Sequence, residues 1–118
     1  MSELQTVATE LLPIPSAAAS IALPLVLVAD ADPSSRMQRR VQLEERGFRV
    51  AVARTAFEAI VKASCHLPDL ILVDASLGDG MNETTELLST CPATKHIPIV
   101  QLTTGRRLPS RVFAVGRA

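Results

Sequence analysis

The chain has 118 residues, of which 47% are hydrophobic, so it can bury one core of ordinary size and has no room for a second. Twelve basic and twelve acidic residues give a formal net charge of zero, which excludes a strong overall attraction to nucleic acid or anionic lipid. With three Phe and neither Trp nor Tyr, the core must be aliphatic, and stacking on nucleobases is not expected to be its main function.

The N-terminal stretch differs in composition from the rest of the chain. Residues 1–23 are rich in Ala, Ser and Pro, so we predict a flexible leader there and a single domain over 24–118. Residues 11–29 carry no charge, but the prolines, the acidic flanks Glu10 and Asp30 and the missing basic n-region argue against a membrane span or signal peptide. The two cysteines have no metal-ligand spacing, and a reducing cytoplasm is the expected location.

The first regular elements are a strand and a helix. The stretch PLVLVAD at 24–30 is a continuous apolar run, typical of a strand covered on both faces. Asp32 and Pro33 supply an N-cap acid and an N1 proline for a helix to about Arg46, which Gly47 ends. Spacing predicts that the core-facing residues of this helix are Met37, Val41 and Leu43.

Strands and helices then continue to alternate. Residues 48–53 form a predicted second strand, and Thr55 with Glu58 fits the capping box of a helix that ends at about Cys65. The remaining predicted elements are a third strand at 69–73, a polar helix at 81–90 that buries Leu87 and Leu88, and a fourth strand at 97–102. This alternation predicts βαβ units, a parallel sheet and a doubly wound α/β fold.

Polar side chains follow three of the predicted strands. In doubly wound folds the ligand site lies beyond the carboxyl ends of the strands, which brings together Asp30, Asp32, Asp74, Thr103 and Thr104. A carboxylate such as Asp74, at the end of a buried strand, costs free energy unless a metal, a phosphate or a helix N-terminus needs it. Carboxylate oxygens suit Mg²⁺, so this edge is a candidate site for a hard cation or a phosphate.

Three segments, VLVADADP, PDLILVD and IPIVQLTT, together resemble the receiver domain of two-component response regulators, and the resemblance covers residues 24 to about 104. It implies a flavodoxin-like doubly wound sheet. It also implies that the chain is a single-domain module of phosphorelay signal transduction. A histidine kinase or phosphotransfer protein would donate the phosphoryl group, and the signal would pass to a downstream protein target. In this role the chain is a signalling domain and not an enzyme.

The resemblance assigns roles to single residues. Asp74 occupies the position of the phosphoacceptor, and Thr103 that of the hydroxyl that senses the phosphate. Mg²⁺ is the implied cofactor, with Asp30, Asp74 and the backbone carbonyl of Ser76 as its implied ligands.

Two departures from the family pattern lie close to these residues. The family usually has two adjacent acids after its first strand, whereas here Asp30 is followed by Ala31. Whether Asp32 replaces the missing metal ligand is open, because Asp before Pro is also ordinary N-cap chemistry. Gly78 stands where the family often has proline, so we expect a looser loop after Asp74.

The largest departure is at the C-terminus. The family continues with a helix, a fifth strand carrying a lysine and a last helix, whereas only fourteen residues follow Thr104 and no Lys follows Lys95. We therefore expect four parallel strands, with the fifth strand and helix missing or irregular. RVFAV at 111–115 is a candidate strand that pairs antiparallel with strand four, extends from the core or joins a partner's sheet. A homodimer could cover the open sheet edge. The candidate replacements for the lysine charge are Arg106, Arg107, Arg111 and Arg117.

Two alternative functions remain open. The departures are also compatible with a pseudo-receiver, a fold retained for protein contacts that is not phosphorylated. A more distant alternative is a haloacid-dehalogenase-like phosphohydrolase, because Asp30 and Asp32 resemble the Asp-x-Asp motif of that family. No direct contact with nucleic acid or membrane is expected under any of the three.

Overall fold

The computed structural model describes residues 23–103 and 108–114. In chain order, its elements are β1 (Leu25–Ala29), α3 (Pro33–Glu45), β2 (Arg49–Ala53), α4 (Ala56–His66), β3 (Leu70–Asp74), the 3₁₀ helix η1 (Ala75–Leu77), α5 (Asp79–Thr90), β4 (Ile99–Leu102) and the 3₁₀ helix η2 (Ser110–Ala114). The predicted leader at 1–23 lies outside the described residues except for Leu23.

The four described strands form one parallel sheet in the order β2-β1-β3-β4. The register places Ala29 opposite both Ala53 and Val73, and Asp74 opposite Leu102, so all four strands end at the same edge. The first described strand, β1, lies inside the sheet; the chain then passes to β2 at one edge and crosses to β3 and β4 on the other side. This confirms the predicted doubly wound α/β fold.

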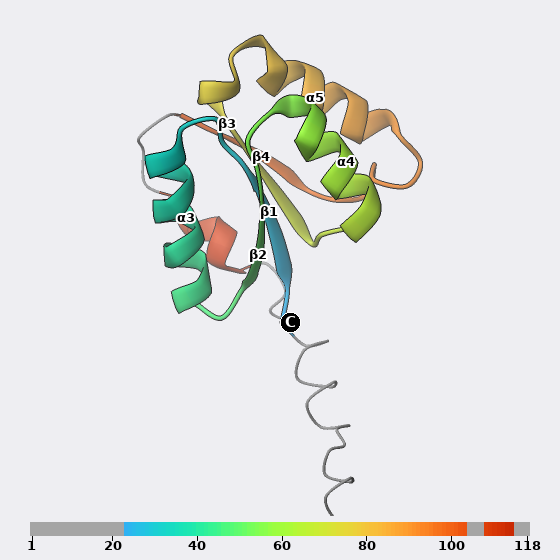
Figure 1. The fold of residues 1–118 in the computed structure, drawn as a ribbon. Helices are drawn as coiled ribbons and strands as arrows, with labels where there is room; N and C mark the ends of the chain where they lie inside the picture. Colours follow the sequence, from blue (N-terminus) through green and yellow to red (C-terminus); the bar gives the residue numbers. More distant parts are fainter. Residues whose placement is uncertain (1–22, 104–107, 115–118) are drawn as a thin grey trace, which may run out of the picture.

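Helices cover both faces of the sheet (Figure 1). The helix α3 and the short η2 lie on one face, and α4 and α5 lie on the other. Neighbouring residues of β1 enter opposite clusters: Leu27 packs in the cluster that includes Ala59 of α4, and Val28 packs in the cluster that includes Leu43 of α3. Because both faces are covered, the strands are apolar without alternation, as their sequence indicates.

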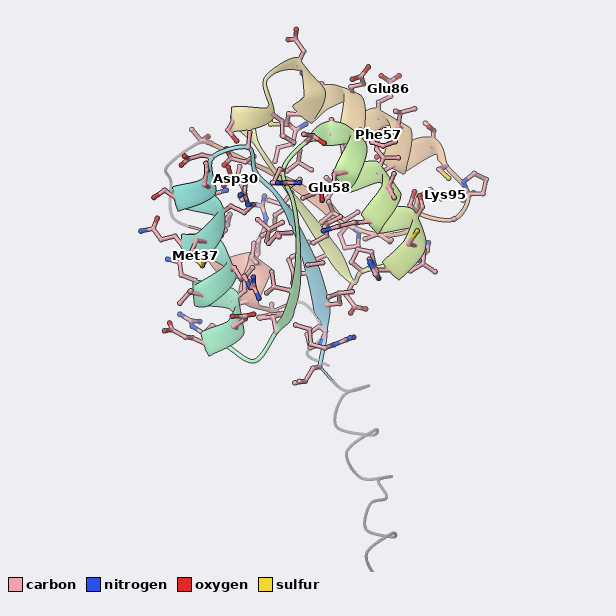
Figure 2. The ribbon with its side chains drawn as sticks, in the orientation of Figure 1. Asp30, Met37, Phe57, Glu58, Glu86 and Lys95 are labelled. Carbon is pink, nitrogen blue, oxygen red and sulfur yellow. The ribbon has the colours of Figure 1, made fainter. Side chains whose placement is uncertain are left out.

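The helix α3 buries a different face from the one its apolar residues predict. Leu43 is fully buried as expected, but Met37 is 57% exposed and Val41 is 43% exposed, so the prediction for these two is wrong. Figure 2 shows Met37 on the outer side of α3, away from the sheet. The buried residues are Ser35, Arg39 and Leu43, which are spaced four apart and share one side of the helix. Carboxylates at the strand ends bind Ser35 and Arg39, so burying this polar face is more favourable than burying the apolar one.

The predicted caps of α3 are confirmed. The carboxylate of Asp32 accepts a hydrogen bond from the N–H of Ser35 at 3.0 Å, and Pro33 occupies the first turn. After the helix, Gly47 has a φ of +90°, a conformation that glycine adopts without the steric cost of a Cβ.

The start of α4 is also capped by its own side chains. The hydroxyl of Thr55 accepts a hydrogen bond from the N–H of Glu58 at 3.1 Å. The carboxylate of Glu58 in turn accepts from the N–H of Arg54 at 2.7 Å, one residue before the N-cap. That backbone hydrogen bond, together with Lys62, holds the pKa of the Glu58 carboxyl below its ordinary value. The residue at which α4 begins is therefore determined by side chains that are adjacent in the sequence.

The later elements begin or end slightly away from the predicted positions. The strand β3 extends to Asp74, one residue further than expected, and α5 starts two residues earlier, at Asp79. The strand β4 starts only at Ile99, because the N–H of Ile97 is used in a turn with the carbonyl of Thr94 and Pro98 has no N–H.

Only one of the two leucines expected to be buried in α5 lies in the core. Leu88 is buried, but Leu87 is 49% exposed, so the prediction for Leu87 is wrong. Adjacent helical residues point about 100° apart, and α5 turns Thr84 and Leu88, four residues apart, toward the core.

The C-terminal segment RVFAV is not a strand over residues 111–114; those residues belong to the 3₁₀ helix η2. Val112 is 1% exposed and joins the core cluster on the α3 face, against which Phe113 also packs. The rings of Phe48 and Phe113 lie 6.4 Å apart, and the guanidinium of Arg46 is 4.2 Å from the centre of the Phe113 ring. A strand would send adjacent side chains to opposite sides, whereas a helical turn lets Val112 and Phe113 pack on the same core face.

Thr55→Ala is expected to lower the free energy of unfolding by about 1 kcal/mol, because it removes the N-cap acceptor of α4. Urea unfolding followed by circular dichroism measures the change. Ser64→Ala, at an exposed position of the same helix, is the control and should leave stability nearly unchanged or slightly raised. An equal loss in both variants would contradict the capping role.

Val112→Ala is expected to lower the free energy of unfolding by about 2 kcal/mol through lost burial and a small cavity. The same urea measurement applies, with the exposed Val61→Ala as control. If Val112→Ala proved as mild as its control, η2 would not contribute to the core in solution.

Candidate functional site

Two carboxylates lie at the ends of the neighbouring central strands. Asp30 follows β1 and Asp74 is the last residue of β3, and neither side chain is exposed. Because Ala29 pairs with Val73, the two acids emerge side by side at the carboxyl edge of the sheet. In Figure 2, Asp30 lies at the end of β1 beside the first turn of α3. The sequence therefore correctly predicted that these acids converge at one edge.

Ser76 connects the two acids. Its N–H donates to Oδ2 of Asp74 at 2.8 Å, and its hydroxyl donates to Oδ1 of Asp30 at 2.9 Å. The N–H of Ala31 donates to the same hydroxyl oxygen at 2.9 Å. The contacts seen for Ser76 thus involve its N–H and side chain, whereas the predicted role concerned its backbone carbonyl.

Asp30 has further donors from its own loop and helix. The hydroxyl of Ser35 donates to its Oδ2 at 2.5 Å, and the N–H of Asp32 donates to its Oδ1 at 2.9 Å. Asp32 itself is exposed and uses its carboxylate to cap α3. The structure therefore gives the carboxylate of Asp32 the capping role, and its N–H is what contacts Asp30.

A buried arginine is the residue that the sequence analysis missed. Nη1 of Arg39 lies 2.6 Å from Oδ1 of Asp74, and the two side chains are 4% and 0% exposed. Nη2 of Arg39 donates to the backbone carbonyl of Thr103 at 3.3 Å. One signal could have found it: on a helical wheel, Arg39 lies between Ser35 and Leu43 on a single face of α3.

A second arginine of α3 reaches the same edge. Nη1 of Arg36 donates to the backbone carbonyl of Asp30 at 3.0 Å. Arg36 and Arg39 are three residues apart, so both guanidiniums leave the same side of the helix. The carboxyl edge therefore carries two fixed positive charges next to its two buried carboxylates.

The predicted replacements for the lysine charge lay in the C-terminal tail. Arg106, Arg107 and Arg117 fall outside the described residues, and Arg111 is exposed in η2. The described cation at Asp74 is Arg39 of α3, and the prediction for the three tail arginines stays a prediction. Thr103 directly follows β4, and its backbone carbonyl, not its exposed side chain, makes the contact described here. Its predicted role as a phosphate-sensing hydroxyl stays a prediction.

The described side chains do not fit a magnesium ion. Mg²⁺ is usually bound through one or two carboxylates and several waters, and it needs open oxygen positions in near-octahedral geometry. Within 23–103 and 108–114, no group of three or more His, Cys, Asp or Glu side chains is placed to hold a metal. The oxygens of Asp30 and Asp74 already accept hydrogen bonds, and the guanidinium of Arg39 adds a positive charge beside them.

Comparisons with solved structures identify the class of protein. The N-terminal domain of a response regulator receiver protein from Methanoculleus marisnigri JR1 is 31% identical, with a TM-score of 0.66 over 75% of this chain and 72% of that one. Chemotaxis protein CheY4 of Vibrio cholerae is 25% identical, with a TM-score of 0.65 over 78% of each chain. Neither the protein-family models nor the curated proteins gave a match.

A third similar structure is a complex. The anti-anti-sigma factor PhyR of Bartonella quintana, bound to the anti-sigma factor NepR, is 27% identical, with a TM-score of 0.55 over 73% of this chain and 37% of that one.

The doubly wound sheet with buried acids at its carboxyl edge is that of a CheY-like signalling domain. The chain belongs to the response regulator receiver family. The family assignment favours the receiver over the phosphohydrolase alternative, since the similar structures are receivers and Asp32 caps a helix. None of the helices in the described part of the chain has the length and apolar character needed to cross a bilayer.

Arg39→Met is expected to lower the free energy of unfolding by roughly 3–5 kcal/mol, because it leaves a buried carboxylate without its charged partner. In a double-mutant cycle by urea unfolding, Arg39→Met with Asp74→Asn should lose less stability than the sum of the single variants. The control cycle uses the exposed pair Arg40 and Glu44, whose coupling should be about 0.3–0.5 kcal/mol. Equal coupling in the two cycles would contradict a buried ion pair.

Proposed function

We propose that this chain is a receiver module of two-component phosphorelay signalling and that Asp74 accepts the phosphoryl group. The observation that carries the proposal is the position of Asp74: it ends β3 beside Asp30 and has a guanidinium at 2.6 Å. A carboxylate oxygen can attack phosphorus, and a nearby positive charge stabilises the charge on the transferring group.

The proposed transfer uses a phosphohistidine of a histidine kinase or phosphotransfer protein. An oxygen of Asp74 forms a bond to phosphorus, the P–N bond breaks, and its electron pair leaves with the imidazole. Asp74 is fully buried, so the site has to open locally before the donor reaches it. Its hydrogen bonds to Arg39 and Ser76 hold the carboxylate in one orientation, and the reaction requires at least one of them to rearrange.

The proposed output is a contact with another protein. PhyR, which shares the fold, forms a complex with the protein NepR, and this supports a protein target for the present chain. We propose no enzymatic reaction beyond phosphoryl acceptance, no direct contact with nucleic acid, and a cytoplasmic location. Among the described strands, β2 and β4 each have a neighbour on one side only, and a homodimer that covers the open edge at β4 is part of the proposal.

The second candidate is a pseudo-receiver that makes the same kind of protein contacts without phosphorylation. Three observations favour it. Ala31 replaces the second acid, Asp74 is unexposed, and its carboxylate is already neutralised by an internal arginine.

Intact mass after incubation with acetyl phosphate and Mg²⁺ separates these candidates. The wild type should gain one phosphoryl group, and Asp74→Asn should gain none. Asp79→Asn, at an exposed acid near the start of α5, is the matched control and should be labelled like the wild type. A folded wild type without any adduct would establish the pseudo-receiver, and labelling that is lost in Asp30→Asn but kept in Asp74→Asn would reject Asp74 as the acceptor.

A further inference from the structure

We infer that Arg39 is a built-in replacement for the metal ion at this site, so that the Asp74 pocket works without a divalent cation. The inference deepens the proposed function where it concerns phosphoryl acceptance. Its central statement, that the arginine and the metal exclude each other, does not depend on phosphorylation.

The first support is the position and burial of the guanidinium. Arg39 contacts Asp74 at 2.6 Å with both side chains almost completely shielded from water. Charges interact far more strongly in such surroundings than at a surface, because water does not screen them. A divalent cation at the same carboxylate would be repelled by the guanidinium at close range. Because the guanidinium lies directly on Oδ1 of Asp74, it takes the place that a metal bound to this oxygen would need.

The second support is the change in the loop after β1. The family pattern has an acid where this chain has Ala31. That change removes a negative charge at the same edge where Arg36 and Arg39 add two positive ones. A site with one acid fewer and with two arginines at its edge has a weaker attraction for Mg²⁺. Ala31 and Arg39 are consistent with one another, since a missing acid and a buried guanidinium both disfavour a bound metal.

The third support is that the guanidinium is held in a fixed orientation. One of its nitrogens binds Asp74 and another donates to the carbonyl of Thr103, at the end of β4. One turn further along α3, Leu43 is fully buried and fixes the helix on the sheet. The planar fork of arginine makes both contacts at once, which the single ammonium of lysine does less well. Arg39 is therefore a positioning residue that orients Asp74 and neutralises its charge.

The chemistry that this arrangement supports is complete without a metal. In transfer from acetyl phosphate, an oxygen of Asp74 bonds to phosphorus, the P–O bond to the acetyl group breaks, and acetate leaves with the electron pair. The oxygens of the transferred phosphoryl group need positive charge and hydrogen-bond donors. Arg39 has donors in a fork that matches phosphate oxygens, and Ser76 and Ala31 place a hydroxyl and an N–H nearby.

Magnesium titration followed by backbone amide shifts in nuclear magnetic resonance tests the inference. Wild type should show no saturable change at Ala31 and Ser76, and Arg39→Gln should gain one, because the two buried acids lose their internal cation. Arg40→Gln is the matched control: Arg40 lies on the same helix, is exposed and pairs with Glu44, so it should behave like the wild type. Saturable binding by the wild type, or no gain in a folded Arg39→Gln, would overturn the inference.

A second measurement needs no variant and covers the case in which Arg39→Gln does not fold. The rate of phosphoryl labelling of the wild type by acetyl phosphate is compared in Mg²⁺ and in excess chelator. An unchanged rate is expected, and loss of labelling in chelator would overturn the inference while leaving the proposed function intact. If no label forms in either condition while the titration gives the expected result, the proposed phosphoryl acceptance fails and the exclusion of the metal by Arg39 stands.

Discussion

The carboxyl edge of this protein depends on the buried ion pair between Arg39 and Asp74. A carboxylate that ends a central strand between two layers of helices has lost its water and is costly unless a donor replaces it. Arg39 and the N–H of Ser76 donate hydrogen bonds to Asp74. The hydroxyls of Ser35 and Ser76 donate to Asp30. These bonds reach across β1, β3, α3 and η1, so they also hold the elements in place around the edge.

The ion pair determines which face of α3 turns inward. An apolar face would have buried Met37 and Val41, yet both are exposed, and the buried side carries a serine and an arginine above Leu43. The two strand-end acids account for this choice, since the free energy of leaving them unpartnered exceeds that of exposing two aliphatic side chains. The helix orientation and the chemistry of the site therefore have the same physical cause.

The departures from the receiver pattern occur in two places. At the site, Ala31 stands where the family pattern has an acid, beside the buried ion pair between Arg39 and Asp74. At the C-terminus, η2 packs Val112 into the cluster around Leu43 and Phe48 and covers part of the α3 face. Family membership thus coexists with differences from the family pattern at these two places.

Most of the fold was predictable because it follows from local rules. The apolar runs, the caps at Asp32 and Thr55 and the glycine after α3 each depend on a few adjacent residues. The predicted ends of strands differ from the observed ones by one or two residues. At Ile97 and Pro98, for example, a turn uses the N–H that the strand would need. The convergence of Asp30 and Asp74 also followed, because parallel strands end at one edge.

By itself, therefore, the sequence determined the order and type of the main elements, the parallel sheet and the edge at which the acids meet. Only the tertiary structure decided which cation faces Asp74, which side of α3 is buried and how residues 110–114 pack. The physical reason is that a salt bridge between residues 35 positions apart, or a 3₁₀ turn that places two neighbouring side chains on one core, depends on distance in space. Local patterns do not encode that distance.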